Sequence, residues 1–401
     1  MTGEPLHVLV NGLVLRPPMG GALRYAIEGL TRLPKTVQGR PLEVSLLISA
    51  RAPWSGLGLE RIEAAGVRML WQDQAPPSPW QRRWTESTLV DHSLRSLAHQ
   101  GHPVHVLQQQ SLPTPAPDLH GDPVRVHLCH GVRAFASRRG IGRAYALSTL
   151  RAALRASRAC IAVSETLAAE LRSLASTPMH VIQPGSEHIQ ASPAPRTAPM
   201  LWIGPARPHK DLDTVLEALE RNADLGPLRL HCDARSLAPY RGRIARLQAR
   251  VELCGELAPG EIGAALATCH AVCLTSKLES FGLVPLEALA AGCPMVLSDL
   301  PAHREVVGDT PRVAWYAPGD AQGFAFAFRA LQAQSAMDVP EGPERAREFS
   351  WQAAARLARA KSGGKLRKRA LDRRQRGSSA PSSATGATLS WRAPLTFCTR
   401  K

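Results

Sequence analysis

Two glutamates, Glu279 and Glu287, are separated by seven residues in a stretch rich in apolar residues, glycine and proline. Paired carboxylates can serve as general acid and base, and the pairs of glycoside hydrolases lie roughly 5–9.5 Å apart. Eight positions along a helix would separate the two by about 12 Å, which argues against hydrolysis. A helix N-terminus beside a glycine is an anion site. The pattern therefore favours carboxylates that hold ligand hydroxyls while phosphates lie on backbone amides. The alternative is that both acids merely complement a helix dipole.

The elements around the two glutamates must position them. The apolar run 271–274 predicts a buried parallel strand before Glu279. Phe281-Gly282 follow, where the backbone can approach a ligand closely. Pro285 is expected at the first helical position, so Glu287 would lie in the first turns of a helix. Glu279 would then lie in a loop at the carboxyl end of a strand, the edge at which open α/β sheets bind ligands.

The stretch 277–299 resembles the signature of the retaining nucleotide-sugar glycosyltransferases of family 4 (glycosyl transferases group 1), which have the GT-B fold. The family motif reads roughly E-G-F-G-L-P-x-L-E-A-M-A-x-G-x-P-V, and this sequence keeps the spacing of the two glutamates. Ser280 replaces the first glycine, Val284-Pro285 differs from the motif, and Leu289 stands for the usual methionine. The resemblance covers roughly residues 5–355. It implies an α/β fold of two Rossmann-like domains that face a central cleft.

A second segment supplies cations. The run 200–203 predicts a strand that leads into Gly204, and Arg207 and Lys210 follow before a leucine-rich helix. Cations in a loop are ordinarily surface residues. Fixed cations in a water-poor cleft would instead stabilise the charge on a departing nucleoside diphosphate. In the family this place reads G-R and then K-G or K-N, so the resemblance implies that Arg207 and Lys210 lie on the diphosphate.

The N-terminal half contains two further candidates. Gly20-Gly21 follow a predicted strand, 7–10, and precede a predicted helix. A glycine pair there either brings phosphates close to backbone amides or forms only a turn. His130 ends another predicted strand, 124–129, although a lone histidine is usually a satisfied polar residue. The resemblance implies that Gly20 and Gly21 face the donor phosphates and that His130 contacts the transferred sugar.

The resemblance also assigns the remaining site residues. Glu279 would bind sugar hydroxyls and act with His130, Arg207 and Lys210 as the catalytic set, and Glu287 would bind the ribose hydroxyls. The other predicted donor-binding residues are Gly204, Gly255, Ser280, Phe281, Gly282 and Leu283. We expect no metal, because no D-x-D motif follows a predicted strand, and no cofactor apart from the nucleoside-diphosphate sugar as substrate.

Length and composition set the domain organisation. The chain has 401 residues, of which 44% are hydrophobic, enough for globular cores. The predicted domains are 1–190 on the acceptor side and 200–355 for the nucleotide sugar, with linker composition at 191–199. Segment 361–401 carries ten of the sixteen net positive charges and is predicted to be disordered. No nucleic-acid-binding module accompanies this charge, so we expect no specific nucleic-acid partner.

Location follows from what the sequence lacks. No signal peptide or run of roughly 18 apolar residues is found. The eight cysteines form no C-x-x-C pair and lie mostly in apolar surroundings, which favours buried free thiols in a reducing cytoplasm. The basic segment 138–159 and the basic C-terminal segment would either be solvated or contact an anionic membrane surface.

The predicted function is transfer of a hexose from a nucleoside-diphosphate sugar to a hydroxyl of a glycan or lipid-linked acceptor, with retention. Mannose is expected because it is common among the relatives, and the setting would be cell-surface polysaccharide or lipopolysaccharide synthesis. A catalytically inactive scaffold or regulatory protein, a nucleotide-sugar epimerase and a phosphorylase are the alternatives, since fold alone does not fix function.

Overall fold

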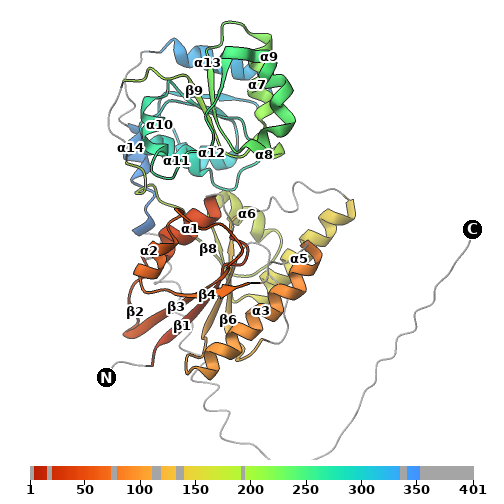
Figure 1. The fold of residues 1–401 in the computed structure, drawn as a ribbon, viewed down its shortest axis with the longest axis vertical. Helices are drawn as coiled ribbons and strands as arrows, with labels where there is room; N and C mark the ends of the chain where they lie inside the picture. The colour runs from red at the N-terminus through yellow and green to blue at the C-terminus, as the bar shows by residue number, and fades with distance from the viewer. Residues whose placement is uncertain are drawn as a thin grey trace, which may run out of the picture. The chain divides into compact units, whose positions relative to one another are not determined.

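A computed structural model of the chain describes residues 4–15, 20–73, 79–110, 119–131, 140–190, 195–334 and 341–352. Within them the chain forms two α/β domains, each built on a largely parallel sheet, as the sequence predicts (Figure 1). The basic segment 361–401 and part of the predicted linker, 191–194, lie outside the described residues, as do Arg138 and Arg139. What the sequence predicts for those segments stays a prediction.

The first sheet has the strand order β2-β3-β1-β5-β6-β7-β8, and β4 pairs with β3. All of its pairings are parallel except that of β2 with β3. The strands are β1 (Leu6–Asn11), β2 (Thr36–Val37), β3 (Arg40–Ser49), β4 (Arg68–Gln72), β5 (Val106–Gln110), β6 (Val124–Cys129), β7 (Ala159–Ala162) and β8 (Met179–Val181). The helices are α1 (Gly21–Leu30), α2 (Leu59–Ala64), α3 (Pro79–His99), α5 (Gly140–Ala156) and α6 (Glu165–Arg172).

The second sheet has the order β11-β10-β9-β12-β13-β14 and is parallel throughout. Its strands are β9 (Met200–Ile203), β10 (Leu228–His231), β11 (Val251–Leu253), β12 (Val272–Leu274), β13 (Met295–Ser298) and β14 (Val313–Tyr316). Its helices are α7 (Leu212–Arg221), α8 (Ala234–Leu237), α9 (Arg241–Leu247), α10 (Ile262–Thr268), α11 (Leu283–Ala290), α12 (Pro301–Val307), α13 (Ala321–Gln332) and α14 (Glu341–Ala346).

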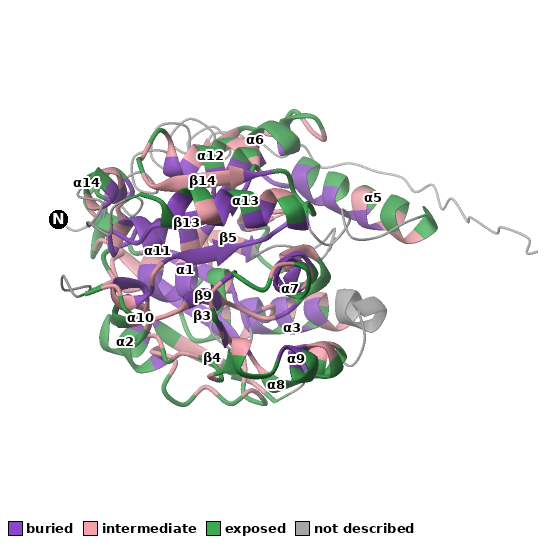
Figure 2. Cartoon of the chain, turned by 90° about the horizontal axis from the view of Figure 1, so that it is seen from above, coloured by how far each residue is buried: buried purple, intermediate pink, exposed green. Residues whose placement is uncertain are grey.

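Both sheets are covered by helices on two faces, as parallel sheets require. Successive side chains of a strand point to opposite faces, and β1 shows the consequence. Val10 packs in the cluster with α1 and α2, whereas Leu9 packs in the cluster with α3. In the second sheet Trp202 packs with α7 and α13, and Leu201 packs with α10, α11 and α12. Figure 2 shows the result, with buried strands and helices that are exposed on their outer faces.

Helix α6 is held at its N-terminus from both domains. Ser164 caps the helix as its position predicts, because its Oγ accepts a hydrogen bond from the Leu167 amide at 3.0 Å. The same hydroxyl donates to the Ser280 carbonyl. The Glu305 carboxylate accepts the Glu165 amide at 2.7 Å, so an acid from α12 complements the dipole of α6.

Helix α11 begins two residues earlier than the sequence predicts. Leu283 is its first residue and Pro285 its third, after Gly282 at φ +95°. Proline is tolerated there because the amides of a first helical turn have no partner within the helix.

The predicted helix 138–159 is described as Gly140–Ala156. Among the described cysteines, all are free and all but Cys254 are buried.

The turn at Gly185 makes a close backbone approach that tests the fold. A Cβ at this position would lie 2.7 Å from the Ser350 carbonyl carbon and still closer to the Trp351 amide nitrogen. Gly185→Ala should therefore lower the free energy of unfolding by about 1–3 kcal/mol, because backbone cannot move aside cheaply. Gly242→Ala in α9 is the matched control, since its Cβ would meet nothing within 4 Å. Equal urea-unfolding midpoints for the two variants would contradict this packing.

Candidate functional site

The order of strands in the second sheet reverses between β9 and β12, which are neighbours. The chain runs from β9 outward through β10 and β11, and then from β12 outward through β13 and β14. The loops after β9 and β12 consequently leave the same carboxyl edge in opposite directions, which is where open α/β sheets bind ligands. The predicted residues at this edge are Gly204, Arg207, Lys210, Glu279, Ser280, Phe281, Gly282 and Leu283.

The two loops are joined by hydrogen bonds. The Lys277 amide donates to the His209 carbonyl at 2.8 Å. Thr275 Oγ1 donates to the Lys210 carbonyl at 2.9 Å and accepts from Trp202 Nε1 at 3.2 Å. A buried tryptophan of β9 thus orients a threonine at the end of β12, which in turn fixes the backbone of Lys210.

Lys210 and Glu279 form an ion pair in this frame. Lys210 Nζ lies 2.5 Å from Glu279 Oε1, and the side chains are 20% and 11% exposed. Ser276 Oγ donates to the same oxygen at 2.9 Å. Burial raises the pKa of the Glu279 carboxyl, but the charge of Lys210 and these hydrogen bonds outweigh it and lower the pKa to about 2, and His303 adds to this effect where its ring is protonated at low pH. Glu279 is therefore an anion at neutral pH.

The hydrogen bonds from Lys210 and Ser276 both fall on Oε1 of Glu279, and among the described residues none falls on Oε2. This oxygen can accept hydrogen bonds from ligand hydroxyls without breaking the pair. Glu279 precedes α11 and bonds to side chains. Among the described residues these bonds are to Lys210 and Ser276, and none is to an amide of that helix.

Asp211 is a residue that the sequence reasoning missed. It is 1% exposed and has φ +51°, which is uncommon for a residue with a side chain. Its carboxylate accepts Thr214 Oγ1 at 2.6 Å and pairs with Lys277 Nζ at 2.8 Å. This second ion pair again joins the β9 loop to the β12 loop, and it fixes the residue next to Lys210. The local signal is the sequence Lys-Asp before a helix.

Arg207 differs from Lys210. It is exposed, and among the described residues its guanidinium makes no ion pair. Its backbone amide donates to the Pro205 carbonyl at 2.8 Å, and its own carbonyl accepts from the Lys210 amide at 2.8 Å. The loop thus holds one engaged cation and one that solvent and ligands can reach.

Glu287 faces the N-terminal domain. It is 3% exposed, and its Oε1 lies 2.9 Å from His188 Nε2 and 3.7 Å from Arg24 Nε. Trp351 Nε1 donates to His188 Nδ1 at 3.3 Å, so Nε2 is the nitrogen that carries hydrogen and donates to Glu287. The sequence reasoning identified neither Arg24 nor His188 as partners of Glu287, because nothing local links residues so far apart in the chain.

The predicted N-terminal residues lie in the same neighbourhood. Gly20 is extended and caps α1, which begins at Gly21 and carries Arg24. The ring of His130 lies 5.3 Å from that of Tyr25, which also contacts the Trp351 ring at 5.4 Å. Gly20, Gly21 and His130 therefore lie near Glu287, through α1 and Trp351. Gly255, at φ +73°, follows the outermost strand β11, two strands away from β9.

One cluster has the composition of a metal site. His7, Glu43 and His102 offer ligand atoms within 4.8 Å of one another. All four ring nitrogens already have hydrogen-bond partners, and Arg68 Nη2 lies 3.1 Å from His102 Nε2. A metal ion would have to displace these bonds beside a guanidinium. The residues moreover lie at the amino edge of the first sheet, where β1 begins and β5 is preceded by His102.

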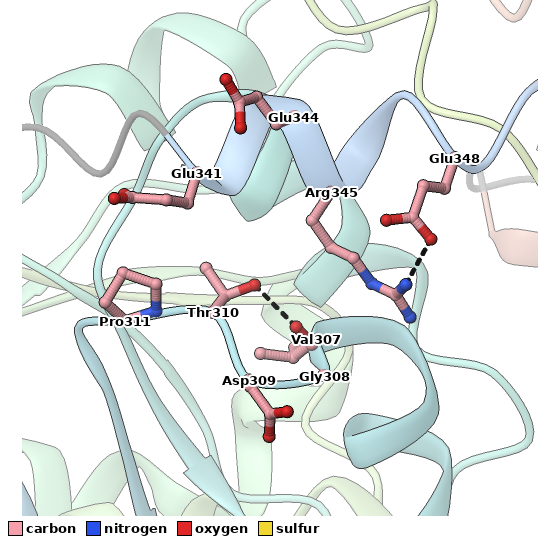
Figure 3. A pocket seen from close by; sticks show the side chains of 9 residues that line it. All are labelled: Val307, Gly308, Asp309, Thr310, Pro311, Glu341, Glu344, Arg345 and Glu348. Atoms are coloured by element: carbon pink, nitrogen blue, oxygen red, sulfur yellow. Dashed lines mark hydrogen bonds and ion pairs between the residues drawn. The ribbon is translucent and has the colours of Figure 1, made fainter.

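A surface hollow lies between the end of α12 and α14 (Figure 3). Figure 3 shows Glu341, Glu344 and Glu348 around it, with Arg345 directed toward Glu348. With Asp309 the lining holds four carboxylates against the single guanidinium of Arg345, and this excess of negative charge would repel a diphosphate. None of the predicted site residues lines this hollow, so it is not the candidate site.

Comparisons with known proteins identify the family to which each half of the chain is similar. The family model described as Glycosyl transferases group 1 matches residues 187–348, and that described as Glycosyltransferase Family 4 matches residues 20–188. A phosphatidyl-myo-inositol mannosyltransferase of Mycobacterium leprae is 29% identical over 155 residues, which are 36% of this chain and 40% of the relative. The chain therefore spans well under half of that relative.

Two solved structures extend the likeness to nearly the whole chain. Sucrose-phosphate synthase from Thermosynechococcus elongatus superposes with a TM-score of 0.69 at 16% identity, covering 93% of this chain and 100% of that one. Anabaena Alr3699/HepE in complex with UDP and glucose gives 0.68 at 16% identity, covering 89% and 99%. At such identities the likeness shows the fold.

The Lys210–Glu279 pair predicts a specific pattern of stability. Lys210→Met should lower the free energy of unfolding by about 3–5 kcal/mol, because it leaves a carboxylate buried without its cation. Adding Glu279→Gln should restore part of that loss. Arg221→Met is the control, since the pair of Arg221 with Glu217 is 62% and 38% exposed and should contribute less than about 1 kcal/mol. Additive losses in a double-mutant cycle would contradict the pair.

The pair also predicts a pH dependence. The Glu279 pKa falls from 4.5 to about 2 on folding, so its contribution to stability is complete above pH 4.5 and is lost as the pH falls toward 2. Between pH 4.5 and 2, the melting temperature of the wild type should fall faster than that of Lys210→Met/Glu279→Gln. Parallel curves would contradict a depressed pKa.

Proposed function

Because this chain belongs to the group 1 and family 4 glycosyltransferases and has the GT-B fold, we propose that it transfers a hexose from a nucleoside-diphosphate sugar to a hydroxyl, with retention. One observation supports this proposal above the others. Two cations and a largely buried carboxylate lie on adjoining loops at the point where the strand order reverses. Anionic ligands with hydroxyl groups fit that combination.

In this proposal Arg207 and Lys210 bind the diphosphate. Negative charge builds on the diphosphate as the bond to the sugar breaks, and a fixed cation stabilises it most where water is excluded. Lys210 is already oriented by Thr275 and Glu279, so little reorganisation is needed. Arg207 is exposed and approaches from the rim of the same loop.

The carboxylates hold hydroxyls in this proposal. Glu279 Oε2 accepts from the transferred sugar, which places the sugar next to the cations that bind its leaving group. Glu287 accepts from the ribose, which requires the hydroxyls to compete with His188 for Oε1 or to bind the other oxygen. The amides of Gly20 and Gly21 at the start of α1 would face the phosphates, and His130 would face the sugar.

The acceptor is proposed from the relatives' names. The mycobacterial relative is a mannosyltransferase named for a phospholipid acceptor, which supports mannose and a lipid-linked hydroxyl. Helix α5 presents Ile141, 88% exposed, and Arg143, Arg151 and Arg155 along its length, a composition suited to an anionic membrane surface. Among the described residues no helix is long and apolar enough to cross a membrane. The contact proposed for α5 is a peripheral one, through its exposed arginines.

Calorimetric titration with UDP, GDP, ADP, UDP-glucose, GDP-mannose and ADP-glucose tests the proposed function. One nucleotide and its sugar should bind the wild type, and Arg207→Ala should weaken that nucleotide about 10- to 100-fold, because a charge-assisted hydrogen bond is lost. Arg221→Ala on α7 is the matched control and should bind as the wild type does. Binding of none of the six would favour a non-catalytic scaffold on the same fold.

A further inference from the structure

His303 is a buried histidine that neither the sequence motifs nor the predicted roles include. It is the third residue of α12 and is 1% exposed. Its Nδ1 lies 2.8 Å from the Ser298 carbonyl oxygen. A carbonyl can only accept, so Nδ1 carries a hydrogen and donates it. Burial lowers the pKa of the ring below 6.5, so the ring is neutral at neutral pH and Nε2 keeps a lone pair.

The Nε2 side of the ring faces the candidate site. A Cβ built on Gly282 would lie 3.3 Å from His303 Cδ2, the atom bonded to Nε2. Gly282 is the residue at which the β12 loop turns into α11. The charges of Glu279 and Lys210 both act on the ring. The Cδ2–Nε2 side of the His303 ring thus lies against the turn at Gly282, three residues after Glu279.

The buried histidines of this protein differ in their partners: His7 has one for each ring nitrogen, the His102 carbonyl and Ser45 Oγ, whereas His127 has none for either. Among the described residues, His303 has one hydrogen-bond partner, the Ser298 carbonyl. Nε2 is therefore an oriented acceptor at the site. Lys210 is engaged with Glu279, so its ammonium is not available to Nε2, and a ligand hydroxyl can donate to this nitrogen.

We propose that His303 Nε2 accepts a hydrogen bond from a hydroxyl of the donor's hexose, beside the hydroxyl that Glu279 binds. This inference rests on the proposed function, because it takes the ligand at this edge to be a nucleotide sugar. An acceptor-only nitrogen and an acceptor-only carboxylate, held on either side of the Gly282 turn, recognise two hydroxyls of one ring. His303 is therefore a specificity-determining residue for the sugar and makes no contact with the nucleotide.

Two substitutions distinguish the role of Nδ1 from that of Nε2. His303→Asn keeps an N–H that can reach the Ser298 carbonyl and removes the acceptor at the position of Nε2. His303→Gln places an amide oxygen near the position of Nε2 and so can restore the acceptor. The readout is the ratio of affinities for the nucleotide sugar and the plain nucleotide, because a loss of packing alone would not change that ratio.

The experiment is calorimetry on the full chain with the nucleotide and nucleotide sugar that bind the wild type among UDP, GDP, ADP, UDP-glucose, GDP-mannose and ADP-glucose. His303→Asn should weaken the nucleotide sugar about 5- to 10-fold and leave the nucleotide unchanged, and His303→Gln should recover at least half of the loss on a logarithmic scale. Melting temperatures show whether both variants fold.

The outcomes are distinct. Equal weakening of both ligands, or no change in either, would overturn the role of His303 while leaving nucleotide binding intact. If His303→Asn does not fold, the test rests on His303→Gln alone, and a ratio below a quarter of the wild-type value would overturn the role of His303 as an acceptor. A wild type that binds none of the six ligands would overturn the proposed function and this inference with it.

Discussion

The site depends on Glu279, a largely buried carboxylate whose negative charge is compensated by its neighbours. Removing a carboxylate from water costs several kcal/mol unless a cation and hydrogen bonds replace the solvent. Lys210 and Ser276 meet that requirement for Glu279. Lys210 can pair with Glu279 in this way only if its loop keeps one conformation. Hydrogen bonds from Thr275 and Lys277 to the backbone of the loop hold that conformation. The strained backbone of Asp211 belongs to the same arrangement, since its carboxylate anchors Lys277.

Helix α11 connects this arrangement with the N-terminal domain. Its start, at Gly282, carries the loop of Glu279, and its fifth residue, Glu287, reaches His188 and Arg24. The Ser164–Ser280 hydrogen bond ties the same loop to the N-terminus of α6. A ligand that engages both Glu279 and Glu287 would therefore act on both domains. If a nucleotide sugar binds as proposed, its binding would be coupled to the contacts between the domains through this one short helix.

Much of the fold and part of the site could be predicted from the sequence. The apolar run before Glu279 and the run before Gly204 predict strands, and side chains after parallel strands meet at one edge, so Lys210 and Glu279 could be expected on the same side of the sheet. Their direct pairing could not, because it requires β9 and β12 to be neighbours, and local patterns do not specify strand order.

Contacts between distant segments could not be predicted from the sequence either, because local patterns do not specify which segments pack together. Glu287 meets Arg24 and His188 through the packing of α11 against the N-terminal domain, and no periodicity encodes that contact. No sequence pattern singles out His303, and only its bond to the Ser298 carbonyl reveals that one ring nitrogen is left without a partner among the described residues. The sequence predicts that α11 begins at Pro285, two residues later than it does. Proline is acceptable at the third helical position as well as at the first, so it does not fix where the helix begins.

The most direct measurement of the central claim is a crystal structure of the chain with a bound nucleotide sugar. The account predicts the diphosphate on the loop of Arg207 and Lys210, and the hexose between Glu279 Oε2 and His303 Nε2, at the carboxyl edge of β9 and β12. A nucleotide sugar bound elsewhere, such as at the amino edge of the first sheet near His7, would contradict it.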